Sequence, residues 1–353
     1  MLKIAIIGAG PAGLSAAVYL SQSQKNHIIH IYEKHKVGEN IICGEGLFRN
    51  LNYELPDIMK VKRLIIMDQE TIEINLPQNS SFVTFNRSEW QICLAEKAVK
   101  HGVKIFENFM ISREHLPDLQ KNYDYLLDGS GYYGVSHNLF PVSELKNYRK
   151  NLVPAFQLNL AGDFSCFEGV LIAKVFNEPP GYFWFFPRKK DNKICLANAG
   201  IGRLRKKKKM AGNIKEKLYK TVSEIVSHYN ILTCKAAPIP TKRFKTFMSK
   251  NVILLGDALG LCSPLHGGGI DTAFFSGFYA AQSILKNNFK IYQDYLKNLD
   301  RRFFMERFIL KLWDLFGSKA VLNRLKNKGL FSDSKEAPFS EKWLKKALIR
   351  MIH

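Results

Sequence analysis

The sequence lacks any apolar run long enough to span a membrane, and it lacks the paired cysteines that typically hold metals. No stretch reaches the ~18 consecutive apolar residues of a spanning helix, so we expect no transmembrane segment. The six cysteines lie far apart without a C-x-x-C pair, which predicts no metal site, no disulfide framework and a reducing cytoplasm. Low-complexity tracts are absent and aromatic residues reach 12%, which excludes disordered and fibrous classes.

Acidic residues are also scarce. The chain of 353 residues has 31 Asp and Glu against 52 Lys and Arg, a net charge of +21. Such a balance usually indicates an anionic partner, either nucleic acid or an acidic membrane surface. Residues 203–209 contain six basic and no acidic side chains, and residues 286–353 carry a surplus of nine positive charges. Most of the excess therefore lies in one predicted loop and in the C-terminal segment.

The order of predicted elements indicates an α/β fold. Residues 2–7 and 27–32 are typical of buried strands, with a helix at 14–22 between them. We expect a small antiparallel sheet at 61–85, further strands at 152–200 and a helical remainder after a strand at 251–255. The sequence thus predicts a Rossmann-like nucleotide-binding domain, interrupted by a β-sheet-rich substrate domain and followed by a helical C-terminal segment. The predicted boundaries are 1–60, 87–150 and 245–290 for the first domain, 61–86 and 151–244 for the second, and 291–353 for the helical segment.

A glycine-rich turn joins the first strand to the first helix. Gly8-Ala9-Gly10-Pro11-Ala12-Gly13 has the G-x-G-x-x-G spacing. Its three glycines permit a tight turn, a close approach to a pyrophosphate and helix–strand packing, and the helix N-terminus attracts phosphate. Glu33 lies 20 residues beyond Gly13, where a carboxylate accepts hydrogen bonds from an adenosine ribose, and Lys34 follows it. These features together predict dinucleotide binding.

A later strand end indicates which dinucleotide is bound. Residues 251–257 end at Gly256-Asp257, on the edge where open α/β sheets bind ligands. An aspartate there can hold a polyol, and FAD has one in its ribityl linker. The following helix would direct its positive N-terminus to the flavin pyrimidine and favour the anionic reduced flavin. FAD is therefore the predicted cofactor of the first domain. The residues that open this helix are Gly267, Gly268, Gly269 and Ile270.

A second match to the glycine pattern runs from Gly129 to Gly134. No clear amphipathic helix follows it, and Pro154 stands where the ribose-binding acid would be expected. We favour a structural or flavin-side turn over a second nucleotide site.

These residues resemble the FAD-dependent geranylgeranyl reductase family, within the wider group that includes the aromatic-ring hydroxylases. The resemblance covers roughly residues 1–290. The most discriminating segment is Tyr182-Phe183-Trp184-Phe185-Phe186-Pro187, which matches the family's Y-x-W-x-F-P signature. Trp90-Gln91 departs from the family's usual Phe-Asp. The other matching parts are the N-terminal fingerprint with Glu33, Cys43-Gly44-Glu45-Gly46, Arg87 to Leu94, Asp128-Gly129, and Gly256 to Gly269.

The resemblance implies an FAD-dependent reductase that saturates isolated C=C bonds in the polyprenyl chain of a lipid, quinone or related substrate. It also implies that Arg87 approaches the cofactor, with Asp128 and Gly129 in the same site. We expect an external electron donor, with a ferredoxin, a quinol and NADPH as the open alternatives. A flavin-dependent monooxygenase of the aromatic hydroxylase type is the first alternative. A basic nucleic-acid-binding flavoprotein is the second, but the chain has no recognisable reader motif, so we predict no nucleic-acid partner.

An isolated alkene has no carbonyl to stabilise a carbanion, so its reduction needs a hydride from flavin N5, a nearby acid and the exclusion of water. The aromatic segment, with Phe185 included, predicts an apolar slot for a prenyl chain, or else an ordinary sheet core. Cys43, with Gly44 beside it, is the predicted catalytic residue, as proton donor or shaping group; the alternative is a small buried hydrophobe. His266 is another candidate acid, or a solvated loop histidine. The predicted substrate-binding residues are Tyr182, Trp184, Phe186, Pro187 and His266.

Two basic segments bear on whether the protein attaches to a membrane. Residues 203–209 form either a solvated loop or a lipid-binding run, in which each cation contributes about 1 kcal/mol near an anionic surface. Between 339 and 353, apolar residues recur at helical spacing with lysines between them. Such a helix either lies in a membrane interface or docks on its own domain. We expect a cytoplasmic protein, with peripheral attachment to the inner membrane face as the alternative that a polyprenyl substrate favours.

Overall fold

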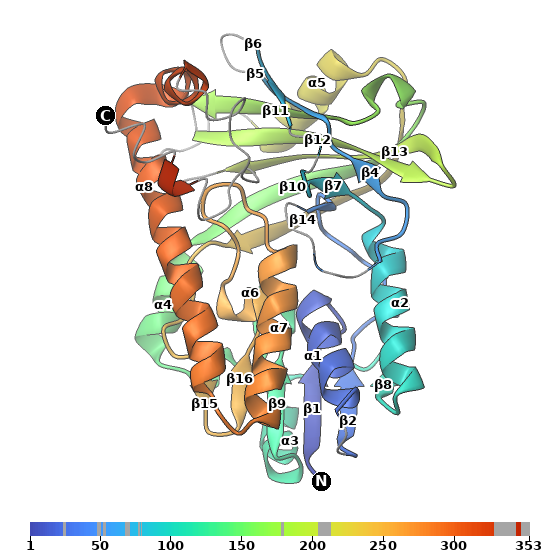
Figure 1. Cartoon of the computed structure of the whole chain (residues 1–353), viewed down its shortest axis with the longest axis vertical. Helices are drawn as coiled ribbons and strands as arrows, with labels where there is room; N and C mark the ends of the chain where they lie inside the picture. The colour runs from blue at the N-terminus through green and yellow to red at the C-terminus, as the bar shows by residue number, and fades with distance from the viewer. Residues whose placement is uncertain are drawn as a thin grey trace.

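The computed structural model describes residues 1–23, 26–47, 51, 54–67, 71–76, 78, 80–177, 180–203, 213–327 and 344–346. It confirms the α/β fold class and the Rossmann-like start. A helix-flanked parallel sheet occupies the lower half of the view in Figure 1, and a broad, mainly antiparallel sheet lies across the upper half.

The parallel sheet has the strand order β15-β16-β9-β1-β2-β8. Its strands pair in parallel except for β15, which pairs antiparallel at one edge. Ile4 to Ile7 in β1 are buried on both faces, as expected where helices cover both sides. The bounds are β1 Lys3–Ile7, β2 Ile28–Tyr32, β8 Lys104–Phe106, β9 Tyr125–Asp128, β15 Met248–Ser249 and β16 Val252–Leu254.

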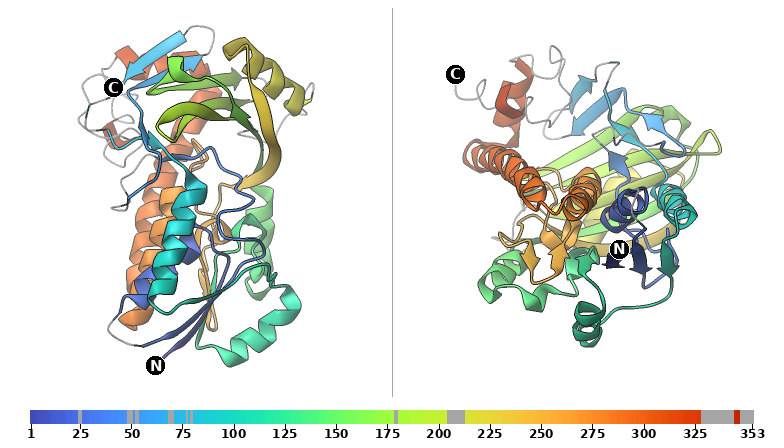
Figure 2. Two further views of the ribbon diagram at one scale, coloured as in Figure 1. Left: turned by 90° about the vertical axis from the view of Figure 1, so that its right-hand side faces the viewer. Right: turned by 60° about the horizontal axis from the view of Figure 1, so that its bottom comes forward.

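Helices cover both faces of this sheet. The helices α1, α2, α7 and α8 stand side by side on one face, and α3 and α4 lie on the other (Figure 2). The non-helical backbone of Gly317 interrupts α8. The bounds are α1 Pro11–Ser21, α2 Arg87–Lys100, α3 Leu116–Asn122, α4 Val142–Lys150, α6 Gly256–Leu259, α7 Ile270–Leu285 and α8 Lys290–Asn327; short 3-10 turns span Arg113–His115, Gly131–Tyr133, His137–Leu139 and Ser165–Phe167.

The contact between α1 and α7 is unusually close because small residues meet there. A Cβ atom added to Gly277 of α7 would lie 2.0 Å from the carbonyl oxygen of Ala12 in α1. Glycine at this position therefore lets the two backbones touch, which fixes α7 against the helix that follows the glycine-rich turn.

The broad sheet has the strand order β14-β10-β13-β12-β11-β5-β6. The helix α5 packs on one face, where Leu218 and Val222 share a core with Phe183 and Phe185 of β12. The bounds are β5 Arg63–Met67, β6 Thr71–Asn75, β10 Leu152–Ala161, β11 Val170–Asn177, β12 Pro180–Lys190, β13 Lys193–Arg203, β14 Asn230–Pro240 and α5 Ile214–Ile225.

The prediction of one small antiparallel sheet at 61–85 is wrong. The β5–β6 hairpin joins the broad sheet, because β5 pairs in parallel with β11. The remaining strand, β7 (Val83–Thr84), pairs with β3 (Gly46–Leu47) and β4 (Met59–Lys60) in a separate three-stranded sheet. Local alternation does not reveal which distant strand provides hydrogen-bond partners, so this pairing was not visible in the pattern.

Candidate active site

A large cavity lies between the carboxyl end of the parallel sheet and the broad sheet. Its volume is about 1180 Å³, above the roughly 300–1,000 Å³ of usual small-molecule sites. Most of the predicted site residues line it, although they come from segments far apart in the sequence. These are Gly8, Gly10, Pro11, Ala12, Glu33, Lys34, Cys43, Gly44, Arg87, Gly129, Tyr182, Trp184, Phe186, Asp257, His266, Gly267, Gly268, Gly269 and Ile270.

The glycine-rich turn has the close contacts that its spacing predicts. Gly8 has φ +95°, and a Cβ atom on Gly13 would lie 2.1 Å from the carbonyl oxygen of Gly8. A Cβ on Gly10 would instead meet no atom within 4 Å, so this glycine faces open space on the cavity wall. The Glu33 carboxylate accepts a 2.7 Å hydrogen bond from the Ala9 backbone N–H, which fixes it beside the turn.

Four predicted residues do not line the cavity. Gly13 and Gly256 lie behind it in close backbone packing, where a Cβ on Gly256 would lie 3.2 Å from that of Ala12. Asp128 is fully buried, and it accepts hydrogen bonds from the backbone and hydroxyl groups of both Ser130 and Ser136. Asp128 therefore shapes the turn after β9. The fourth residue, Pro187, is treated with the aromatic strand below.

The second glycine pattern forms a structural turn at the edge of the cavity. Residues Gly131–Tyr133 make a short 3-10 turn and no helix of the nucleotide-binding kind. Gly134 has φ +52°, and a Cβ there would lie 2.0 Å from the His137 ring. The pattern thus reflects local packing, as the missing acid at position 154 indicates.

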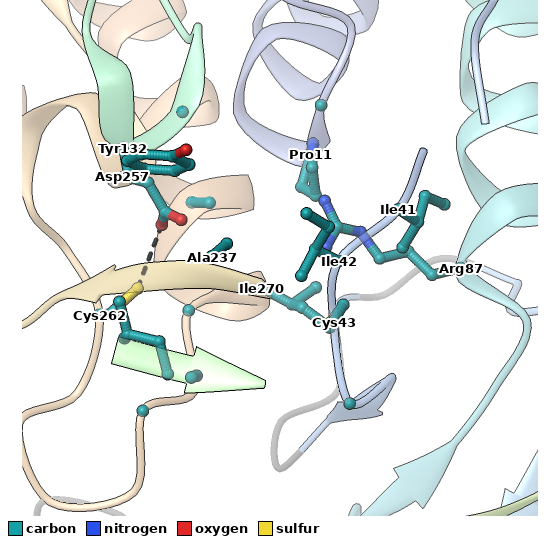
Figure 3. A pocket seen from close by; sticks show the side chains of 18 of the residues that line it. Pro11, Ile41, Ile42, Cys43, Arg87, Tyr132, Ala237, Asp257, Cys262 and Ile270 are labelled. Atoms are coloured by element: carbon teal, nitrogen blue, oxygen red, sulfur yellow. Dashed lines mark hydrogen bonds between the residues drawn. The ribbon is translucent and has the colours of Figure 1, made fainter. Parts of the chain in front are cut away.

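One wall of the cavity combines a carboxyl group and a thiol. Figure 3 shows Tyr132, Asp257 and Cys262 on this side, facing Ile42, Cys43 and Arg87 across the open space. The Cys262 thiol donates a hydrogen bond to Asp257 Oδ1 at 3.2 Å. Burial raises the pKa of both groups. Sequence reasoning missed Cys262, whose only signal was its place between Asp257 and the glycine run.

The opposite wall holds Arg87 through a small hydrogen-bond network. Arg87 Nε donates to Gln91 Oε1 at 2.8 Å, and Gln91 Nε2 donates to the carbonyl oxygen of Ala9 at 3.3 Å. The Arg87 backbone N–H donates to Glu45 Oε1 at 3.1 Å. Gln91, which departs from the family pattern, therefore links Arg87 to the glycine-rich turn.

The loop that carries Cys43 is fixed by a buried ion pair. Glu45 has φ +58°, and its Oε2 lies 2.5 Å from Arg188 Nη1 of β12, with both side chains under 10% exposed. Burial raises the pKa of Glu45, although Arg188 and Arg87 act in the opposite direction. The Glu45 backbone N–H also donates to Cys43 Sγ at 3.2 Å. Glu45 thus connects the thiol to the aromatic strand.

The aromatic strand β12 presents alternate residues to the cavity. Tyr182, Trp184 and Phe186 line it, whereas Phe183 and Phe185 are fully buried in the core beneath α5. The prediction that Phe185 belongs to the slot is therefore wrong, because side chains alternate between the two faces of a strand. Pro187 also has the parity of the far face; its carbonyl oxygen accepts a 2.7 Å hydrogen bond from the Thr84 hydroxyl.

Neighbouring groups fix the indole of Trp184. A Cβ added to Gly200 of β13 would lie 2.0 Å from the Trp184 ring, so glycine is what allows the ring to lie there. The indole N–H donates to Asn198 Oδ1 at 2.7 Å. On its other side, a Cβ on Gly44 would lie 3.2 Å from the indole nitrogen. The aromatic wall therefore has a defined shape next to the Cys43 loop.

The cavity continues into an apolar end that sequence reasoning did not find. Its side chains come from the broad sheet and from α8, namely Leu64, Ile66, Val175, Ile309, Trp313 and Val321. No local motif joins these residues, because strand pairing and the docking of α8 bring them together.

Comparison with known proteins agrees with this geometry. Residues 6–40 match the model of an NAD(P)-binding Rossmann-like domain. A digeranylgeranylglycerophospholipid reductase from Methanosphaerula palustris is 25% identical over 323 residues, covering 79% of this chain and 75% of the relative. The crystal structure of a geranylgeranyl bacteriochlorophyll reductase-like protein from Thermoplasma acidophilum superposes with a TM-score of 0.76 at 19% identity, covering 98% and 95% of the two chains. The chain is thus similar over most of its length to proteins named as geranylgeranyl-lipid reductases.

The fold is also shared with flavin-dependent enzymes outside the geranylgeranyl reductases. A flavin-dependent brominase superposes with a TM-score of 0.67 at 15% identity, covering 99% of each chain. At this identity the likeness concerns the fold alone, so the shared architecture does not distinguish between reactions.

FAD, the cofactor of the geranylgeranyl reductase family, fits the residues that are present. The space in front of Gly10 admits a pyrophosphate at the start of α1, and the fixed Glu33 carboxylate lies where a ribose would bind. Asp257 offers a carboxylate for a polyol chain on the same cavity wall. In the described part of the chain, no group of His, Cys, Asp and Glu residues has the arrangement of a metal site.

Proposed function

We propose that this protein is an FAD-dependent reductase that saturates C=C bonds in a geranylgeranyl-type polyprenyl chain on a lipid, quinone or related substrate. One observation carries the proposal: a single cavity joins the glycine-rich turn to the aromatic face of β12 and to an apolar end against α8. The names of the curated relatives make a digeranylgeranylglycerophospholipid the first substrate to test. They give the monooxygenase alternative less support.

FAD, once bound and reduced, supplies a hydride to one carbon of the double bond. The chain binds and orients the reactants around this step. Gly8 and Gly10 would face the phosphates of FAD, Glu33 would hold the ribose and Asp257 would hold the polyol. Tyr182, Trp184 and Phe186 hold the prenyl chain in place and exclude water, which makes a productive approach more frequent.

The second carbon of the alkene needs a proton, and the two thiols in the cavity differ in their ability to give one. Cys262 already donates its S–H to Asp257, and burial raises its pKa well above the ordinary value. Cys43 Sγ instead accepts a hydrogen bond from the Glu45 backbone, which leaves its own proton for another acceptor. We therefore assign the proton-donating or site-shaping role to Cys43, with Gly44 allowing the loop to approach Trp184.

The decisive experiment is an anaerobic assay of the chain loaded with FAD. Dithionite reduces the bound flavin, digeranylgeranylglycerophospholipid in detergent is added, and mass spectrometry follows the lipid. The expected product gains two hydrogens per saturated bond. A parallel assay in air with NADPH tests the alternative: a hydroxylated product and NADPH consumption that requires oxygen would support the monooxygenase instead. Replacing dithionite in turn with reduced ferredoxin, a quinol or NADPH identifies the donor class.

We further propose that the protein attaches peripherally to an anionic membrane surface, where such lipids reside. None of the helices in the described part of the chain combines the length and apolar content needed to cross a bilayer. The outer side of α8 nevertheless exposes Phe304, Leu315 and Phe316, each more than 60% exposed, together with Lys311. Most of the two basic segments singled out in the sequence, 204–209 and all but Leu344 to Lys346 of 339–353, lies outside the described residues.

A further inference from the structure

A buried ionic cluster joins α8 to the loop that precedes α7. Arg302 of α8 is only 3% exposed. Its Nε donates to Glu306 Oε1 at 2.8 Å, and its Nη1 lies 3.4 Å from Asp271 Oδ2 at the start of α7. Ser263, in the loop, donates to Glu306 Oε2 at 2.6 Å. One guanidinium therefore faces two carboxylates from different helices. The planar fork of arginine, with several N–H donors, suits this geometry better than the single ammonium group of lysine.

The same guanidinium reaches the cavity through His266. Arg302 Nη2 lies 3.3 Å from His266 Nε2. The Tyr182 hydroxyl donates to the backbone oxygen of His266 at 2.5 Å, and the His266 backbone N–H donates to the Ser263 hydroxyl at 3.2 Å. His266 is thus held from β12, from α8 and from within its own loop, and it is no freely solvated histidine.

These contacts also restrict what His266 can do chemically. An arginine side chain has only donors, so Nε2 of His266 must accept from it and has no proton there to give. The Gly268 backbone N–H points at the other ring nitrogen, Nδ1, at 3.2 Å. A neutral imidazole has one acceptor nitrogen and one N–H, so His266 accepts from Arg302 or from Gly268 but not from both at once. Accepting from Arg302 at Nε2 places the ring proton on Nδ1, on the side of Gly268.

We propose that Arg302 is a positioning residue: it acts through His266 to fix the wall formed by Gly267, Gly268 and Gly269, against which FAD binds. The proposal rests on the FAD site described above. It gives α8 a role in cofactor binding that the glycine-rich motifs do not reveal. The wall is sensitive to small shifts, because a Cβ on Gly267 would lie 2.8 Å from the Tyr182 hydroxyl and one on Gly268 would lie 2.7 Å from the His266 ring.

The test is a double-variant cycle on FAD affinity. Arg302→Lys keeps the positive charge beside the two carboxylates but loses the fork that reaches His266. We expect FAD to bind about tenfold more weakly, the scale on which outer hydrogen-bond partners affect bound groups. In a His266→Ala background, the same substitution should change the affinity by less than about twofold, because its route of action is gone. Arg301→Lys is the matched control, since Arg301 is exposed, and it should bind FAD as the wild type does.

Flavin fluorescence titration gives the dissociation constants, and the visible spectrum of bound FAD reports changes around the ring. An unchanged affinity in Arg302→Lys, or an equal loss in both backgrounds, would overturn the proposal in favour of a purely structural cluster. If Arg302→Lys fails to fold, His266→Ala alone decides: it should show the tenfold loss, and wild-type affinity would refute the idea. A wild-type chain that binds no FAD fails before any variant is compared, and this result would overturn the proposed function as well.

Discussion

The two thiols on the cavity wall have different neighbours, and this difference leads to the first prediction. Cys43→Ala and Cys43→Ser should both retain FAD, because the predicted FAD contacts lie on other residues. If Cys43 gives the proton, both variants should lose alkene reduction by about 10²-fold or more, the usual contribution of a positioned acid. Product formation in the anaerobic assay measures this loss. Cys262→Ala is a comparison variant on the opposite wall, and full turnover by both Cys43 variants would contradict the assignment.

Asp257 gives a prediction about pH. Burial raises its pKa above the ordinary 3.8, so ionisation of this carboxyl costs more in the folded chain than in the unfolded chain. The cost is absent below the ordinary pKa and accumulates as the pH rises toward the folded pKa. Asp257→Asn removes this cost, so the FAD-free variant should be more stable than the wild type at pH 7, with a difference that shrinks toward pH 4.

Urea unfolding of the FAD-free proteins at a series of pH values measures this difference. The same variant should bind FAD more weakly if, as proposed, this carboxylate holds the polyol; improved stability at the expense of ligand binding is common in functional sites. A stability difference that stays constant with pH would show that Asp257 is not the group responsible.

At the scale of helices and strands, the contact between α1 and α7 sets a narrow tolerance. A Cβ on Gly277 would lie 2.0 Å from a backbone oxygen that cannot move aside cheaply. We expect Gly277→Ala to lower the free energy of unfolding by about 1–3 kcal/mol or more, the range of overpacked sites. Gly202→Ala in β13 is the matched control, because its nearest neighbour would be 3.8 Å away. Equal stability of the two variants, measured by chemical denaturation, would contradict this account.

The parts of the site that a short local motif encodes could be predicted from the sequence. The turn from Gly8 to Gly13 with Glu33 was placed correctly, since its strand, helix and acid lie within one short segment. The side chains of β12 alternate between its two faces with a period of two residues. The prediction that placed Phe185 in the slot ignored this alternation. Gln91 and Cys262 required the packed structure, because each acts on a residue from another part of the site. The apolar end at Ile309 and Trp313 was invisible for the same reason, since the helical pattern of α8 does not say what it covers.

At the scale of the whole molecule, charge and exposed apolar side chains point to the same partner. The net charge of +21 attracts anionic surfaces at a distance, while large apolar side chains on α8 give short-range affinity. We expect the FAD-loaded protein to sediment with vesicles containing phosphatidylglycerol at low salt and to be released as salt rises.

Replacement of Leu315 and Phe316 by Asp should weaken vesicle binding by at least about tenfold, because burying each of these side chains contributes roughly 1.5–3 kcal/mol. Val142→Asp is the control, since Val142 is 66% exposed on α4, at the other face of the parallel sheet. Vesicle sedimentation with equal affinity for all three proteins would exclude this face of α8 as the attachment surface. The substrate in detergent should still be reduced by the double variant, which separates membrane attachment from catalysis.

The position of Trp184 over Gly200 has a consequence for how substrate choice evolves in this fold. The core under α5 uses the odd-numbered aromatic residues of β12, so selection on the even-numbered ones leaves that core intact. A larger side chain at position 200 would displace the indole and narrow the passage for the prenyl chain, without any substitution in the wall itself. The width of the proposed passage is thus set one strand away from the surface that the substrate is expected to touch, at a position outside the aromatic signature.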